Sequence, residues 1–111
     1  MFKSYDVDGV TVIVPEGELD VTNSAQFRDR VLEEFVSAGK TKIVLDMSNV
    51  GYMDSSALGT IISLFKNCKM NGGSLALASL VDSVRRLFTI TALDKVVPIY
   101  DTVDQAVSKL K

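Results

Sequence analysis

The sequence contains no histidine, and this absence excludes several kinds of site at once. A Ser-His-Asp triad and a histidine general acid or base are impossible. A Cys/His metal site is also excluded, because the chain has a single cysteine, Cys68. One cysteine cannot form an internal disulfide, and the apolar neighbours of Cys68 at helical spacing predict a buried thiol. We expect neither a metal nor a cofactor.

Other familiar signatures are missing as well. No G-x-G-x-x-G or Walker-type loop and no G-x-S-x-G elbow occurs, so the seven glycines are interpreted as turn and cap residues. Twelve Lys and Arg against fourteen Asp and Glu give a net charge of -2 without blocks of one sign, which disfavours direct nucleic-acid binding. No segment approaches the roughly 18 apolar residues of a membrane span, and the first residues do not form a signal core. We therefore predict a cytoplasmic protein that is not an enzyme and does not insert into membranes.

What the chain does have is a globular composition, with 111 residues of which 47% are hydrophobic. A chain of this length buries roughly 65% of its unfolded surface, which predicts one domain around one core. Asp8 and Gly9 lie between two β-branched runs and predict an antiparallel hairpin, because both turn positions need a positive φ. We expect a mixed α/β sheet of about five strands with helices packed against it, in the order β-β-α-β-α-β-α-β-α.

The later elements follow from hydrophobic spacing. Several N-cap candidates at residues 22–24 open a first helix, which ends at residues 38–39. The run 43–45 predicts a strand buried on both faces and paired in parallel. A long amphipathic helix is expected at about 55–71, a buried strand at 75–78, a short helix from Asp82 or Ser83, a strand at 96–100 with Pro98 suited to an edge, and a helix at 103–110.

Asp46 follows the buried strand as the phosphoacceptor does in response-regulator receivers. Receivers, however, begin with a β-α unit and carry a Lys before a late Pro, whereas this chain begins with a hairpin and has Val97 before Pro98. We interpret Asp46 as a polar residue that ends a strand.

Asp54, Ser55 and Ser56 stand where the long helix begins. Asp and Ser are preferred N-caps because their oxygens accept hydrogen bonds from the free backbone N–H groups of a first turn. By themselves these three residues therefore favour a capping role that needs no further function.

In its context the segment resembles the STAS family, specifically the bacterial anti-sigma factor antagonists. The resemblance covers essentially the whole chain and implies a single STAS domain over residues 1–111. It rests on the segments Gly-Glu-Leu-Asp at 17–20, Ile-Val-Leu-Asp-Met-Ser at 43–48, Met-Asp-Ser-Ser-Ala-Leu-Gly at 53–59, Asn-Gly-Gly at 71–73 and Arg-Arg-Leu-Phe at 85–88.

The resemblance implies a phosphorylation switch. Ser55 is expected to be phosphorylated by an anti-sigma factor that is also a serine kinase, and a phosphoserine phosphatase is expected to reverse the modification. The unmodified form would bind the anti-sigma factor and release the sigma factor, and phosphorylation would abolish that binding. The implied partner-binding residues are Gly17, Glu18, Leu19, Asp20, Asp54, Ser55 and Ser56.

Two alternatives remain open at this point. Ser56 competes with Ser55 as the acceptor hydroxyl, since both lie near the helix start. The chain could also serve as a STAS scaffold or accessory subunit of a stress-sensing complex or a membrane transport system. Ala57 stands where the family pattern more often has Gly, and we expect a slightly firmer helix start with Ser55 still exposed.

Overall fold

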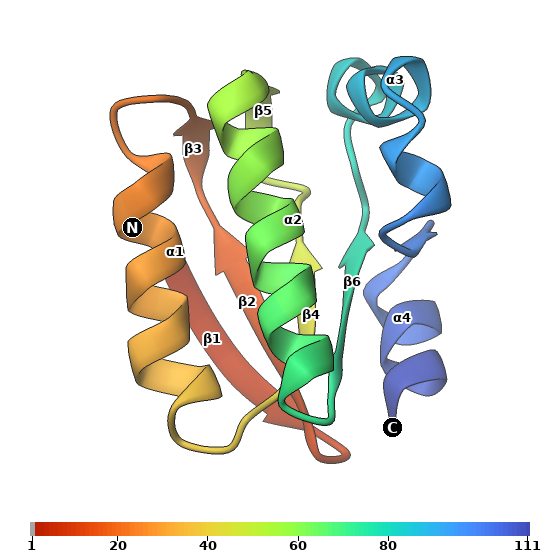
Figure 1. Ribbon diagram of the computed structural model, residues 1–111. Helices are drawn as coiled ribbons and strands as arrows, with labels where there is room; N and C mark the ends of the chain where they lie inside the picture. The colour runs from red at the N-terminus through yellow and green to blue at the C-terminus, as the bar shows by residue number, and fades with distance from the viewer. Residues whose placement is uncertain (1) are drawn as a thin grey trace.

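The computed structural model describes residues 2–111, which fold into layers of helices on both faces of a sheet (Figure 1). The strands are β1 Phe2–Val7, β2 Val10–Pro15, β3 Gly17–Leu19, β4 Lys42–Asp46, β5 Val50–Met53, β6 Ser74–Ala78 and β7 Ile99–Tyr100. The α-helices are α1 Ser24–Val31, α2 Ser55–Met70, α3 Asp82–Ile90 and α4 Val103–Leu110. A π-helical stretch, η1 Leu32–Val36, continues α1, and a short 3-10 helix, η2 Leu93–Lys95, follows α3.

The main sheet has five strands in the order β1-β2-β4-β6-β7. β1 and β2 form the expected antiparallel hairpin, and Asp8 and Gly9 adopt the positive φ values of 53° and 80° that its turn requires. β2, β4, β6 and β7 pair in parallel, as predicted for strands joined by crossover helices. The predicted fold class is therefore confirmed.

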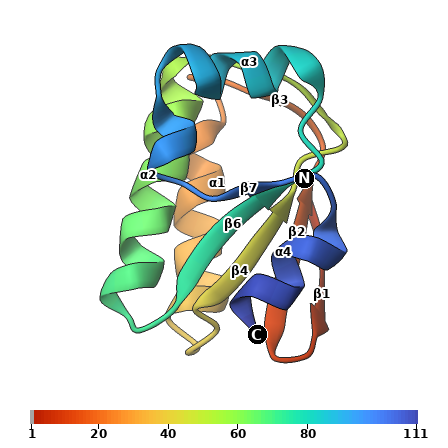
Figure 2. The ribbon, with the colours of Figure 1, turned by 90° about the vertical axis from the view of Figure 1, so that its right-hand side faces the viewer.

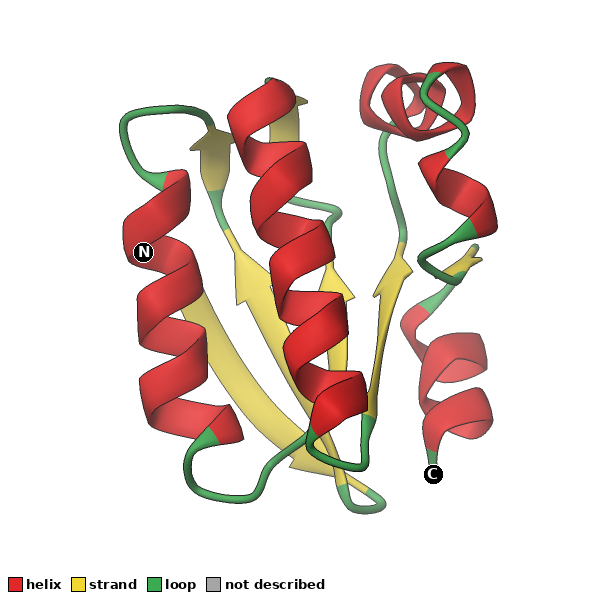
Figure 3. Ribbon diagram, in the orientation of Figure 1, coloured by secondary structure: helices red, strands yellow, loops and turns green. Residues whose placement is uncertain are grey.

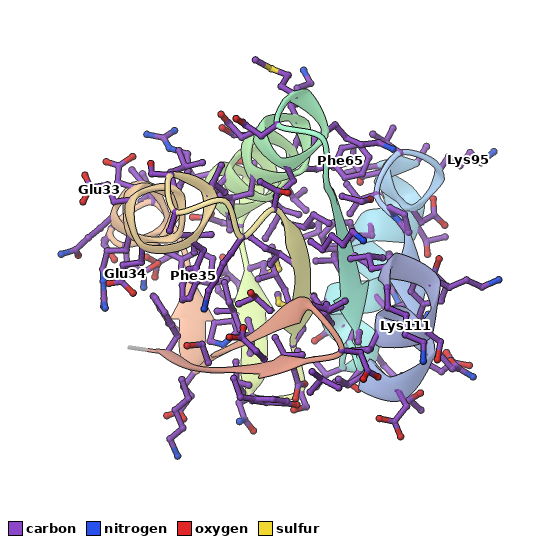
Figure 4. All side chains as sticks on the ribbon, turned by 90° about the horizontal axis from the view of Figure 1, so that it is seen from below. Glu33, Glu34, Phe35, Phe65, Lys95 and Lys111 are labelled. Atoms are coloured by element: carbon purple, nitrogen blue, oxygen red, sulfur yellow. The ribbon has the colours of Figure 1, made fainter. Side chains whose placement is uncertain are left out.

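Helices cover the two faces of this sheet unequally. α1 and α2 pack on one face and α4 on the other, as Figure 2 shows. Figure 3 shows α1 and α2 in front of the strands. Phe35 of η1 lies between its helix and the sheet (Figure 4). Because β4 and β6 lie between these layers, residues 43–45 and 75–78 are completely buried, as their apolar runs predict.

Two features differ from the sequence prediction. The last strand was predicted too long: only Ile99 and Tyr100 pair with β6, because η2 turns the chain so that Val97 enters the core and Val96 stays exposed. Pro98 directly precedes this edge strand, where its missing N–H costs no ladder bond. The second difference is a separate parallel ribbon of β3 and β5, for which the sequence shows no strand pattern.

Cys68 is buried in the core on the inner face of α2, as expected. Burial away from water disfavours the thiolate and raises the pKa of the thiol to about 11. The group is therefore a neutral packing residue near neutral pH. Among residues 2–111, no helix is both long enough and apolar enough to cross a lipid bilayer.

Gly73 lies between α2 and β6, where the backbone packs closely against Thr41. A Cβ at residue 73 would lie 2.0 Å from the Thr41 carbonyl oxygen, which accepts the Ser74 N–H at 2.9 Å. We expect Gly73→Ala to lower the free energy of unfolding by about 2 kcal/mol, since overpacking a filled site costs about 1–3 kcal/mol. Urea unfolding measures this loss.

Gly59 provides the matched control, because it lies within α2 and a Cβ there would meet nothing within 4 Å. Gly59→Ala is expected to raise stability by up to about 1 kcal/mol, since Ala is the better helix former. A Gly73→Ala protein as stable as the wild type would contradict the close approach.

Candidate functional site

The ribbon of β3 and β5 brings together the two segments that the sequence analysis singled out. Its register pairs Glu18 with Tyr52 and Leu19 with Met53. Because the strands are parallel, both end at the same edge, above the main sheet in Figure 1. The residues that follow them, Asp20 and Asp54, therefore start neighbouring loops, and the Asp54 N–H donates to the Leu19 carbonyl at 3.3 Å.

Asp54 connects these two loops through both oxygens of its carboxylate. Oδ1 accepts the Ala57 N–H at 3.0 Å, which makes Asp54 the N-cap of α2. Oδ2 accepts the Val21 N–H at 2.9 Å, across a sequence separation of 33 residues. One side chain thus caps the helix and holds the β3–α1 loop against it.

The β3–α1 loop is also ordered from within. Asp20 Oδ1 accepts hydrogen bonds from the Thr22 hydroxyl and, at 2.9 Å, from the Thr22 N–H. Both bonds stabilise the charged carboxylate and lower the pKa of Asp20, and the bond from the hydroxyl has the larger effect. Asn23 donates its Nδ2 to the Glu18 carbonyl at 2.8 Å and accepts the Asp20 N–H at 3.0 Å. Asn23 precedes α1 without capping it through its side chain, because that side chain is used in the loop.

Ser55 is the first residue of α2 and is exposed, whereas Ser56 is half-buried. Within the described chain, neither hydroxyl takes part in a hydrogen bond. The methyl group of Ala57 is buried and does not cover Ser55. The expected exposure of Ser55 is therefore confirmed. A reactant arriving from solvent therefore reaches the Ser55 hydroxyl more readily than that of Ser56.

The remaining predicted residues take different positions. Gly17 opens β3 with a φ of 86°, which L side chains rarely adopt, and its N–H donates to the Asn49 carbonyl at 3.0 Å. Glu18 is exposed beside Tyr52. Leu19 differs from its neighbours because its side chain is buried in the core. Its side chain attaches the ribbon to the core and is not available to a partner.

Asp46 ends β4 as interpreted, and its Oδ1 accepts the Ser48 N–H at 3.1 Å.

Two exposed residues at this edge were not singled out from the sequence. Val21 is 71% exposed and Tyr52 is 52% exposed, although both are apolar enough to be buried. Across residues 2–111, no group of His, Cys, Asp and Glu side chains is arranged to hold a metal ion, and no pocket is enclosed. What the two loops present is a surface with a hydroxyl, carboxylates and two apolar side chains.

Comparison with known proteins agrees with this architecture. The family model described as STAS domain matches residues 2–106. A Thermotoga maritima protein named, provisionally, as an anti-sigma factor antagonist is 37% identical over 111 residues, which is 100% of this chain and 98% of that protein. A crystal structure of such a protein from the same organism matches with a TM-score of 0.93 and 37% identity, covering 98% of this chain and 93% of the other.

A relative with a more specific name comes from Paenibacillus polymyxa. Its anti-sigma F factor antagonist is 34% identical over 103 residues, which is 93% of this chain and 88% of that protein. The family match over residues 2–106 extends from β1 into the first turn of α4 and includes both loops of the edge described above. The chain therefore belongs to the STAS domain family.

Proposed function

We propose that the chain is an anti-sigma factor antagonist that is controlled by phosphorylation of Ser55. In this proposal the unmodified protein binds an anti-sigma factor, which then releases its sigma factor, and phosphorylated Ser55 prevents the binding. The names of the bacterial relatives support the class of partner. The observation that carries the proposal is the exposed Ser55 hydroxyl beside Asp54, at the edge where the two loops meet.

The kinase is proposed to be the anti-sigma factor itself, and a separate phosphoserine phosphatase would restore the binding form. A kinase active site must surround the acceptor hydroxyl. The exposed Ser55 at the start of α2 can enter such a site more readily than the half-buried Ser56. Exposure therefore favours Ser55 over Ser56. Because sigma factors act on RNA polymerase, we place the protein and its partner in the cytoplasm.

The proposed partner surface includes Gly17, Glu18 and Asp20 from β3 and its loop, together with Asp54, Ser55 and Ser56 from the start of α2. Its loops are held by hydrogen bonds in the free protein. Binding therefore loses little further loop entropy, which favours affinity. The protein acts in this scheme by occupying a partner and not by converting a substrate.

Phosphate transfer tests the acceptor assignment. We expect purified anti-sigma factors of the source organism, incubated singly with the protein and ATP, to include one that adds a single phosphoryl group. Intact-mass measurement counts the groups, and fragmentation locates them. Ser55→Ala is expected to abolish labelling, and Ser56→Ala is the matched control that should retain it. Labelling lost only in Ser56→Ala would move the acceptor to Ser56, and no transfer from any anti-sigma factor would contradict the switch.

A further inference from the structure

Val21 and Tyr52 lie on the outer side of the edge formed by β3 and β5. Glu18 and Tyr52 are register partners and share one face of the ribbon, whereas the next pair, Leu19 and Met53, faces the core. Tyr52 therefore points away from the core. Val21 follows β3 and is fixed by its N–H bond to Asp54, the residue before Ser55. Two exposed apolar side chains thus belong to the two segments that the Asp54 carboxylate joins beside the proposed acceptor.

The charges at this edge have one sign. Glu18, Asp20 and Asp54 are its carboxylates, and no Lys or Arg occurs between Lys3 and Arg28 or between Lys42 and Lys66. None of the three carboxylates takes part in an ion pair within residues 2–111. Within these two segments the charged side chains are therefore all negative.

The neighbouring helix α3 supplies only a partial counterbalance. α3 packs against β5 and carries Arg85 and Arg86. Arg85 donates to Asp101 at 3.3 Å and is directed toward the end of β7. Among residues 2–111, Arg86 forms no ion pair, so it is the cation of α3 that is free to offset negative charge at this edge. A single Arg cannot balance the three carboxylates of Glu18, Asp20 and Asp54.

From these positions we infer that Val21 and Tyr52 are the apolar anchors of the anti-sigma factor interface, and that the partner meets them with an apolar patch rimmed by Lys and Arg. The inference rests on the proposed function and adds the chemistry of the partner surface. Aromatic residues at the centre of an interface commonly carry much of its binding energy, and a rim of opposite charge accelerates association.

Charge at the rim and charge on Ser55 act on different rates. Rim carboxylates attract a basic partner from a distance and raise the association rate constant, which salt screens. A phosphoryl group on Ser55 sits beside the Asp54 carboxylate and the apolar anchors, where docking removes its water. That local cost raises the dissociation rate constant and persists in salt. An acidic edge is thus compatible with inhibition by phosphorylation.

The anchors are tested with matched tyrosines, in binding kinetics with the purified anti-sigma factor that phosphorylates the protein. Tyr52→Ser is expected to weaken binding at least about tenfold, as loss of an interface hot spot does. Tyr5→Ser is the control: Tyr5 is 48% exposed against 52% for Tyr52, but it pairs with Val12 on the face that α4 covers. Its affinity should stay within about twofold of wild type, because surface positions outside an interface contribute little. Equal effects of the two substitutions would overturn the inference.

The sign of the partner charge is tested first on the unaltered protein and then on two charge-reversal variants. Raising NaCl from low to high concentration is expected to lower the association rate constant by about tenfold. Glu18→Lys should lower it severalfold, whereas Glu33→Lys makes the same charge change on the outer side of η1 (Figure 4) and should not. An association rate constant that is independent of salt, or that rises with salt, contradicts a basic partner.

The two proposals fail in different ways. If the wild-type protein binds no anti-sigma factor, the proposed function fails and the interface inference falls with it. If binding occurs and responds to phosphorylation while the matched variants behave alike, only the interface inference fails. Circular dichroism of each variant ensures that a loss of affinity is not a loss of folding.

Discussion

Ser55→Asp is expected to bind the anti-sigma factor at least about a hundredfold more weakly than wild type, whereas Ser55→Ala should bind within a few-fold. An unpaired charge transferred into an interface costs several kcal/mol even after relaxation, and each ~1.4 kcal/mol is a tenfold change in affinity. Within α2, the first cation after Ser55 is Lys66, about three helical turns away, so the helix offers no partner for the charge. Isothermal titration calorimetry measures the three affinities.

The same charge should leave the free protein folded. A helix N-terminus carries about +0.5 elementary charge, and an acidic residue in the first turn stabilises a helix by about 0.3–1 kcal/mol. The unfolding midpoint of Ser55→Asp is therefore expected to equal or slightly exceed that of wild type. Equal affinity of the Ala and Asp variants, or an Asp variant that loses affinity only because it unfolds, would contradict a switch based on charge.

A phosphoryl group brings about -1.5 to -2 charges, so its effect should exceed that of aspartate. Because the penalty arises from water lost on docking, it should persist in high salt, which screens exposed charges much more than buried ones. This persistence separates the switch at Ser55 from the general acidity of the edge around Glu18 and Asp20.

The parts of the fold predicted from the sequence are those with strong local signals. The helices α2 and α4 show apolar residues at helical spacing, and the fully apolar runs of β4 and β6 indicate strands buried on both faces. The stretch η1 lies within the first helix that the apolar spacing predicts, but neither its π-helical geometry nor the 3-10 helix η2 has a local signal. Both depend on how the chain closes onto the core, where Phe35 and Val97 are buried.

The ribbon of β3 and β5 escaped prediction because its strands contain three and four residues, too few to show an alternating pattern. Gly17 and Gly51 further weaken the strand signal. As a result, the residue pattern indicates Asp20 and Asp54 only separately, and it is the family resemblance that groups them on one partner surface. The exposed position of Tyr52 also depends on this pairing, because its register with Glu18 decides which face it occupies.

Asp54→Ala is expected to lower the free energy of unfolding by about 2 kcal/mol, the second large effect predicted for this edge. Loss of an N-cap costs about 0.5–2 kcal/mol, and a hydrogen bond to a charged group contributes about 1.5–3 kcal/mol when water does not replace it. The bond from Val21 is exposed, so water recovers part of its contribution. Asp46→Ala is the control, because that half-buried carboxylate accepts only the nearby Ser48 N–H, and its loss should be less than half as large.

Asp54→Asn separates the two roles of this side chain. Asn is as good an N-cap as Asp, but its single carbonyl oxygen cannot accept the Ala57 and Val21 N–H groups from opposite sides as the two carboxylate oxygens do. We expect this variant to keep most of its stability while the Val21 amide loses protection from hydrogen exchange and the Ala57 amide keeps it. A loosened loop must be ordered again on docking. We therefore expect the loss of binding free energy with the anti-sigma factor to exceed the loss of unfolding free energy. Unchanged protection of Val21 in Asp54→Asn would show that the loop is held without this carboxylate.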